Sequence, residues 1–272
     1  MNLYAVKTDA AGLVVWSKQY GEDSAVDMGF QAVEVADGYV IAGTTFSYGP
    51  GYDAMWLLKL DATGEQVWSR TFGGDSNDWG HALARTADGG FVVAGGAGSF
   101  GNSYQMYLVK TDAEGLAQWE RTYGDHGYER AEQVVVLADG YLLVGQTQSI
   151  ATSGNDNLYV VKTDLAGNQL WDYAHGSTGN EFAYAALALP GGDLLIAGGT
   201  SGMWDAGGSP GWLLRLDAGG ALRWSSRIGD GALANRLGSL IAAGPDAVVV
   251  GGYLTETAGA DPRACLLKVD LP

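Results

Sequence analysis

One short motif recurs along the chain and constrains the fold more than any other feature. A basic residue, any residue and Asp form a triplet that occurs six times, ending at Asp9, Asp61, Asp112, Asp164, Asp217 and Asp270. Successive copies are 52, 51, 52, 53 and 53 residues apart. In the first five copies a tryptophan stands seven positions after the Asp, at Trp16, Trp68, Trp119, Trp171 and Trp224. Self-similarity at such a period is the signature of a repeat architecture. The chain is therefore predicted to consist of repeated structural units.

Each repeat predicts four short β-strands. In the second copy, Trp79–Ala87 alternates and is followed by a glycine-rich hairpin turn, Asp88-Gly89-Gly90. Phe91–Ala94 then has the aromatic and β-branched residues that suit a pleated sheet, and Met106–Lys110 and Ala117–Thr122 complete the repeat. We name these four positions strands A, B, C and D. No segment has sustained helical periodicity, which argues against a parallel α/β sheet.

Stacked four-stranded sheets predict an all-β, five-bladed β-propeller with antiparallel blades. A single such sheet has two apolar faces, and a ring of sheets buries both. We expect one domain, residues 1–272, with repeats at approximately 22–73, 74–123, 124–175, 176–228 and 229–272, the last completed by 1–21. The chain begins and ends in a C strand, which gives five A, five B, five D and six C strands. Pairing of the N- and C-terminal strands is expected to close the ring, and the sixth C strand is then extra, displaced or exchanged with another molecule.

The net charge limits the classes of partner that the protein is expected to bind. The chain has 31 acidic and 15 basic side chains and a formal net charge of −16. Such a surface repels phosphate backbones and anionic lipids, so neither nucleic acid nor a membrane is an expected partner. A monomer is expected, with strand exchange as the alternative route to an oligomer.

The repeat resembles a known family. The second copy contains Asp61, Gly64, Trp68 and Gly73-Gly74, followed by Asp88-Gly89-Gly90-Phe91-Val92-Val93-Ala94-Gly95. This pattern resembles pyrroloquinoline-quinone-type propeller repeats, and is still more similar to secreted bacterial and archaeal proteins with repeats of about 50 residues. The resemblance covers almost the whole chain. It implies a propeller at the cell surface or outside the cell, from which a signal sequence has been removed, but it implies no activity and no bound quinone.

The five repeated tryptophans have two interpretations. The preferred one places them in the seams between blades, where each buries a large apolar area. The alternative is an exposed aromatic array on which sugars stack.

A second repeated series precedes strand A and consists of Asp27, Asp78, Glu129, Glu181 and Asn235. The preferred hypothesis pairs each acid with the repeated basic residue of strand C, at Lys7, Lys59, Lys110, Lys162 and Arg215. The alternative is a ring of oxygen ligands for Ca²⁺, for which Asp27, Asp78, Glu129 and Glu181 are the candidates. No other cofactor is expected.

Two positions in strand A vary while their neighbours repeat. The residue after each acid is Met28, Trp79, Arg130, Phe182 or Arg236, and two positions further on stand Phe30, His81, Glu132, Tyr184 and Gly238. This variation marks either a ligand surface or tolerance to substitution, and the sequence leaves both open. The D–A and B–C connections share the end of the sheet at which these residues lie, and their long loops include Trp204. All the side chains named here, glycine aside, are the predicted ligand-binding residues.

No catalytic residue is predicted. The histidines His81, His126 and His175 lie in different contexts, and neither a nucleophile elbow nor a metalloprotease motif occurs. The predicted function is a non-enzymatic, extracellular recognition propeller that presents its loop-rich face to a glycan or a protein. The alternatives are a glycosidase-like hydrolase working through Asp78, Glu129 and Glu181, and a purely structural repeat domain of a surface protein.

Overall fold

Strands account for all the regular secondary structure that the computed structural model describes. It describes residues 1–101, 103–149, 155–176, 179–201, 211–228, 236–244, 246–254 and 263–271. These ranges contain no helix that could cross a lipid bilayer. The chain divides into two compact units, Met1–Tyr123 and Gly124–Pro272. The all-β class predicted from the sequence is confirmed.

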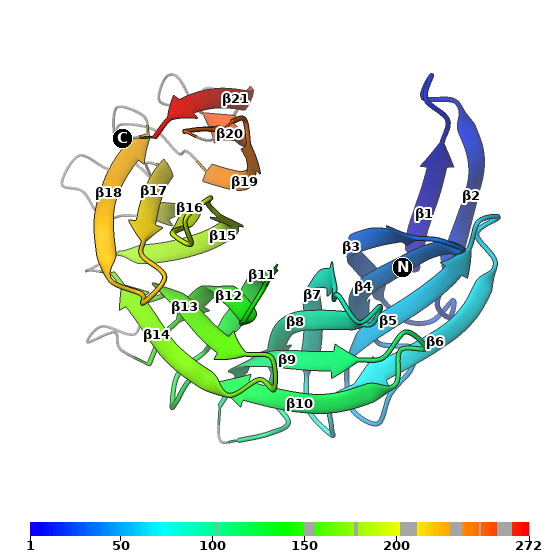
Figure 1. Ribbon diagram of the computed structural model, residues 1–272. Coiled ribbons are helices and arrows are strands. Elements are labelled where there is room, and N and C mark those ends of the chain that lie inside the picture. Colours follow the sequence, from blue (N-terminus) through cyan, green and yellow to red (C-terminus); the bar gives the residue numbers. More distant parts are fainter. Residues whose placement is uncertain are drawn as a thin grey trace. The chain divides into compact units, whose positions relative to one another are not determined.

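The first unit contains one hairpin and two four-stranded sheets (Figure 1). The hairpin is formed by β1 (Leu3–Thr8) and β2 (Val14–Tyr20). The first sheet has the order β3 (Asp27–Val35), β4 (Gly38–Thr45), β5 (Ala54–Asp61) and β6 (Gln66–Phe72). The second sheet has the order β7 (Asp78–Arg85), β8 (Phe91–Ala97), β9 (Gln105–Thr111) and β10 (Ala117–Tyr123).

The second unit contains two four-stranded sheets and one three-stranded sheet. The first is β11 (Arg130–Leu137), β12 (Gly140–Thr147), β13 (Asn157–Asp164) and β14 (Gln169–His175). The next is β15 (Asn180–Ala188), β16 (Leu194–Ser201), β17 (Gly211–Leu216) and β18 (Leu222–Ile228). The last is β19 (Arg236–Ala242), β20 (Ala247–Leu254) and β21 (Arg263–Asp270).

Each four-stranded sheet has the strand order of a propeller blade. Its strands pair in chain order and all pairs are antiparallel, so strand A lies at one edge and strand D at the other. Among the described residues there are five A, five B, six C and five D strands, the numbers that the repeat predicts. The β1–β2 hairpin and the β19–β21 sheet are separate sheets, and a blade that joins them is not among the described pairings. The number of blades and the closure of a ring stay predictions.

The repeated Asp of the C–D turn fixes that turn. In each of the first five copies one carboxylate oxygen accepts hydrogen bonds from the backbone N–H groups two and four residues later, as Asp61 does from Thr63 (2.8 Å) and Glu65 (2.9 Å). The glycine three residues after the Asp has a positive φ, +81° at Gly64, which a side chain would strain. The repeated Asp and Gly therefore both serve the C–D turn.

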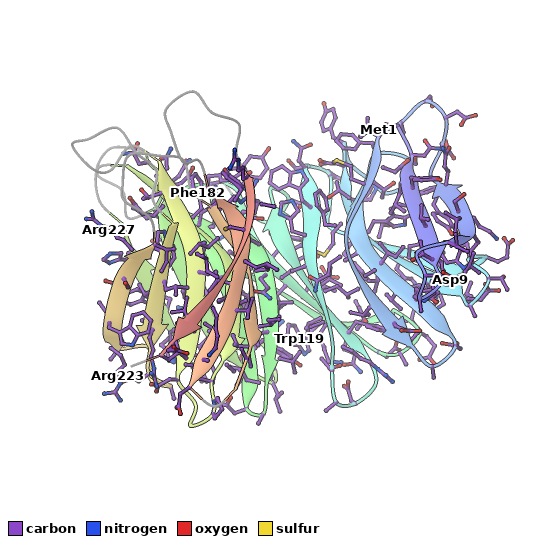
Figure 2. The ribbon with its side chains drawn as sticks, turned by 90° about the horizontal axis from the view of Figure 1, so that it is seen from above. Met1, Asp9, Trp119, Phe182, Arg223 and Arg227 are labelled. Atoms are coloured by element: carbon purple, nitrogen blue, oxygen red, sulfur yellow. The ribbon has the colours of Figure 1, made fainter. Side chains whose placement is uncertain are left out.

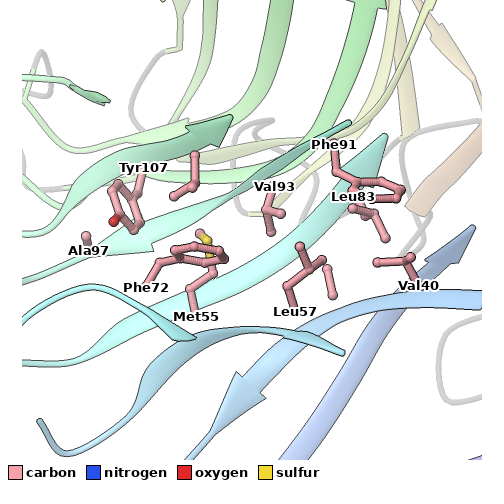
Figure 3. Close-up of a cluster of buried hydrophobic side chains, with 11 residues drawn as sticks. Val40, Met55, Leu57, Phe72, Leu83, Phe91, Val93, Ala97 and Tyr107 are labelled. Carbon is pink, nitrogen blue, oxygen red and sulfur yellow. The ribbon is translucent and has the colours of Figure 1, made fainter. Parts of the chain in front are cut away.

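Apolar side chains fill the space between neighbouring sheets within each unit. In the first unit, Met55 and Leu57 of β5 lie in one cluster with Leu83, Val93 and Tyr107 of the next sheet, and all five are buried (Figure 3). Burying such side chains contributes about 1.5–3 kcal/mol each relative to leaving them exposed. Neighbouring sheets of one unit therefore pack face to face, as propeller blades do.

Three of the repeated tryptophans lie in these seams. The indole Nε1 of Trp16 donates to the Ala62 carbonyl of the next sheet (3.1 Å), and Trp171 donates to Ala218 in the same way (3.2 Å). A Cβ on Gly115 would lie 2.7 Å from the Trp68 ring, so this indole packs directly on the next C–D turn. The predicted seam position is confirmed for these three, although the side chains are half-buried rather than fully buried.

Trp68→Ala is expected to lower the free energy of unfolding by about 2 kcal/mol. This is less than the roughly 3–5 kcal/mol for a fully buried aromatic side chain, because part of the indole already faces water. Urea denaturation measures the difference. Val67→Ala, at a neighbouring position that is 56% exposed, is the control and should change stability by less than about 0.5 kcal/mol. Equal effects of the two substitutions would contradict the seam role.

Candidate functional site

The repeated basic residue of strand C pairs with an acid of the A–B turn. Four ion pairs share this arrangement: Lys59–Asp37 (2.6 Å), Lys110–Asp88 (2.8 Å), Lys162–Asp139 (2.8 Å) and Arg215–Asp193 (2.8 Å). Lys110, hydrogen-bonded to Asp88, lowers the pKa of that carboxyl to about 2. The prediction that these basic residues pair with the acids before strand A is therefore wrong for all four of the pairs that the structure describes.

The antiparallel order of the strands explains the error. Asp78 opens β7 and lies level with Ala97 of β8 and Gln105 of β9, whereas Lys110 lies five residues further along β9. At the rise of an extended strand this separation is about 17 Å. The two series thus lie toward opposite ends of each sheet.

The acids before strand A bind hydroxyl and backbone groups instead. Asp78 accepts hydrogen bonds from the Ser99 hydroxyl (2.6 Å) and from the Gly74 backbone N–H (2.8 Å). A Cβ on Gly73, where φ is +118°, would lie 2.1 Å from the carboxylate, so the chain before β7 wraps tightly around it. Asp78 therefore joins the D–A connection to the start of the B–C loop.

The same arrangement recurs in the other repeats. Asp27 accepts from the Thr45 and Ser47 hydroxyls, Glu129 from those of Thr147 and Ser149, and Glu181 from that of Thr200. All four acids are buried. The described partners of these carboxylates are thus hydroxyl and backbone groups of their own repeat. In the described ranges no three His, Cys, Asp or Glu side chains gather as metal ligands, and Asn235 lies outside those ranges.

Every A strand contains a β-bulge at one of the two variable positions. In the pairing of β7 with β8, Gly80 is opposite Gly95 and Ala82 is opposite Ala94, which leaves His81 as the extra residue. The other four A strands have the same shift, and their extra residues are Phe30, Glu132, Tyr184 and Gly238. A bulge bends the strand and redirects a side chain, and bulges are frequent beside binding sites.

A repeated glycine of strand B makes room for the bulge. A Cβ on Gly95 would lie 1.8 Å from the carbonyl oxygen of Trp79. Gly43, Gly145, Gly198 and Gly252 meet the carbonyl oxygens of Met28, Arg130, Phe182 and Arg236 at 1.9–2.0 Å. This strand-B glycine, Gly95 in the second copy, is thus the sequence signature of the bulge.

In the first unit, the variable residues form what we call the aromatic edge: Met28, Phe30, Trp79 and His81. The Phe30 and His81 rings are 4.6 Å apart, although they come from neighbouring sheets. Trp79 stacks on Tyr104 (4.9 Å, 23°) and donates its Nε1–H to Asp53 (2.7 Å). Burial raises the pKa of the Asp53 carboxyl.

In the second unit, they form what we call the charged edge: Arg130, Glu132, Phe182, Tyr184 and Arg236. Arg130 forms an ion pair with Glu132 (2.6 Å). The Phe182 and Tyr184 rings stack at 5.9 Å, and the Arg236 guanidinium lies 3.6 Å from the centre of the Tyr184 ring. Within this unit Phe182 lies near one end of the strands and Arg223 near the other (Figure 2).

Comparisons with known proteins add little to this geometry. No protein-family model matches the chain, and no curated protein matches its sequence. One similar solved structure is a subtype N10 neuraminidase-like protein of A/little yellow-shouldered bat/Guatemala/060/2010, with a TM-score of 0.46 and 10% identity over 93% of this chain and 82% of that chain. A similarity this weak assigns neither a ligand nor an activity to the present chain.

The structure thus groups nine of the ten predicted ligand-binding residues within their own units, and Trp204 lies outside the described residues. Two kinds of residue that the sequence does not mark hold these side chains in place. Gln31 accepts a hydrogen bond from the Leu83 N–H of the next A strand (3.0 Å), and Gln133 accepts one from Ala186. Asp53 and Tyr104 come from B–C loops, where no repeated pattern marks them.

Proposed function

We propose that the protein is an extracellular, non-enzymatic recognition propeller that binds a glycan at the loop-rich end of its A strands. The observation that carries the proposal is the bulge in every A strand. The bulged position is also the position at which otherwise faithful repeats differ. A constant framework that presents a different side chain from each repeat is the arrangement of a recognition surface.

The aromatic edge favours a glycan over a protein as the ligand. Phe30 is half exposed, and its ring has a polar neighbour in the imidazole of His81, 4.6 Å away. A sugar ring offers an apolar C–H face beside its hydroxyl groups, which suits a single aromatic ring next to hydrogen-bonding side chains. A protein partner would require a larger, contiguous apolar centre.

The closed five-bladed ring belongs to the same proposal. The strand counts support it, since one D strand lies at the N-terminus and the last repeat lacks one. Apolar side chains on the two terminal sheets also support it. Tyr4 is 61% exposed at a position that is buried in three of the four complete sheets, and Leu266 is 79% exposed at a position that is buried in all four. The extracellular location rests on the resemblance to secreted repeat proteins, and the monomeric state is a further part of the proposal.

A glycan array tests the proposal. The wild type is expected to bind at least one class of glycan, with and without Ca²⁺. Phe30→Ala should weaken that binding about tenfold or more, since stacking on an aromatic ring contributes on the order of 1 kcal/mol beyond its buried area.

Leu116→Ala is the matched control, because it removes a similarly exposed apolar side chain at the C–D turn, at the other end of the strands. It should bind glycans as the wild type does. If the wild type binds no glycan on the array, the proposal is wrong and the structural repeat domain becomes the better explanation.

A further inference from the structure

Among the described residues, the Arg236 guanidinium is held by a ring contact and not by hydrogen bonds. The group lies flat enough against the Tyr184 ring to come within 3.6 Å of its centre. Arg236 is exposed, and among the described residues its side chain makes no hydrogen bond or ion pair besides this ring contact. A guanidinium presents five N–H donors in a planar fork, and stacking on an aromatic ring leaves that fork open at its rim.

Three charged side chains surround the same phenol. Burial raises the pKa of the Tyr184 phenol, Arg236 and Arg130 lower it, and Glu132 raises it. These charges come from β11 and β19, the A strands that pack on either side of β15, the strand of Tyr184. Two guanidinium groups and one carboxylate leave one net positive charge.

That charge is unusual in this chain, whose net charge is −16. Arg130 is already engaged by Glu132 (2.6 Å) and contacts Gln146 (3.4 Å), so Arg236 is the group left for a ligand. A single positive charge suits a monoanion better than a phosphate, which carries nearly two negative charges at neutral pH. The acidic surface disfavours any polyanion further.

We propose that the charged edge is a carboxylate subsite, in which Arg236, held on Tyr184, binds the carboxylate of an acidic sugar. The paired oxygens of a carboxylate match the guanidinium fork, and the bidentate geometry distinguishes an acid from its neutral counterpart. The neighbouring rings of Phe182 and Tyr184 offer an apolar surface to the sugar itself. This inference rests on the glycan binding proposed above and names the class of glycan.

Isothermal titration with two small probes tests it. Methyl β-D-glucuronide carries the carboxylate, and methyl β-D-glucoside is its neutral counterpart. The wild type should bind the glucuronide about tenfold more tightly, and the preference should shrink as NaCl is raised, because salt screens the charge. Arg236→Gln should abolish the preference without lowering the melting temperature, and Arg236→Lys should restore part of it, since Lys keeps the charge but not the fork.

Arg223→Gln is the matched control. Arg223 is an exposed arginine of the same unit, and it lies near the other end of its strands (Figure 2). This variant should keep the preference of the wild type. Equal binding of the two probes, or a preference that survives in Arg236→Gln, would overturn the subsite while leaving the glycan proposal intact. Failure to bind either probe also overturns the subsite, and the array then decides separately whether any other glycan binds.

Discussion

Gly95→Ala is expected to lower the free energy of unfolding by about 3 kcal/mol or more, at or above the upper end of the usual cost of overpacking. A Cβ at this position would lie 1.8 Å from the Trp79 carbonyl oxygen, and both atoms belong to the backbone framework of a buried strand pair. No side-chain rotation can relieve this contact. Either the two strands separate or the bulge at His81 is lost.

Gly238→Ala is the matched control, because it is the same substitution at a bulge position where nothing lies within 4 Å of the added Cβ. It should change stability by less than about 0.5 kcal/mol, as surface substitutions usually do. Chemical denaturation of the two variants and the wild type makes the comparison. A Gly95→Ala variant as stable as the wild type would show that the bulge does not require this glycine.

The elements that repeat were predictable from the sequence because each copy confirms the others. The turn at Asp61 and Gly64 is held by local interactions, since one Asp61 carboxylate oxygen accepts hydrogen bonds from backbone N–H groups two and four residues later. The large indole ring of Trp68 requires a large packing surface, and the seam between two sheets provides one. Neither inference depends on how distant parts of the chain meet.

The bulges were not predicted, although two signals in the sequence mark them. Gly95 follows Ala94 in strand B, and His81 stands at a position that differs in every copy. Each signal has an ordinary explanation by itself, such as a tight turn or a tolerant surface. Only the pairing register shows that Gly95 makes room for the carbonyl group of Trp79, two residues before His81.

The partner of Asp78 was predicted wrongly for a different reason. Charge complementarity suggested Lys110, but the direction of the strands already places the start of A and the end of C at opposite ends of an antiparallel sheet. The hydroxyl of Ser99 gave no such signal, because serines in loops are common. Topology was the stronger argument, and it was available from the sequence.

Asp78→Ala is expected to lower the free energy of unfolding by about 3 kcal/mol. The substitution leaves two part-buried donors, the Ser99 hydroxyl and the Gly74 N–H, without their acceptor, and such a loss costs about 1–3 kcal/mol for a buried group. EDTA should leave the melting temperature of the wild type unchanged, since these groups already satisfy the carboxylate. A fall in melting temperature with EDTA that Ca²⁺ restores would instead indicate a cation site.

Double-mutant cycles then decide which partner each charge has. Asp78→Ala and Lys110→Met should be additive within about 0.5 kcal/mol, because the two side chains are far apart in the same sheet. Asp88→Ala and Lys110→Met should instead show a coupling of about 1 kcal/mol, since the Lys110 side chain is 5% exposed and Asp88 is its carboxylate partner at 2.8 Å. The coupling stays modest because Asp88 itself is 54% exposed and water screens the pair. Coupling of Lys110 to Asp78 rather than to Asp88 would contradict the structure. It would support the ion pair between Asp78 and Lys110 that charge complementarity alone suggests.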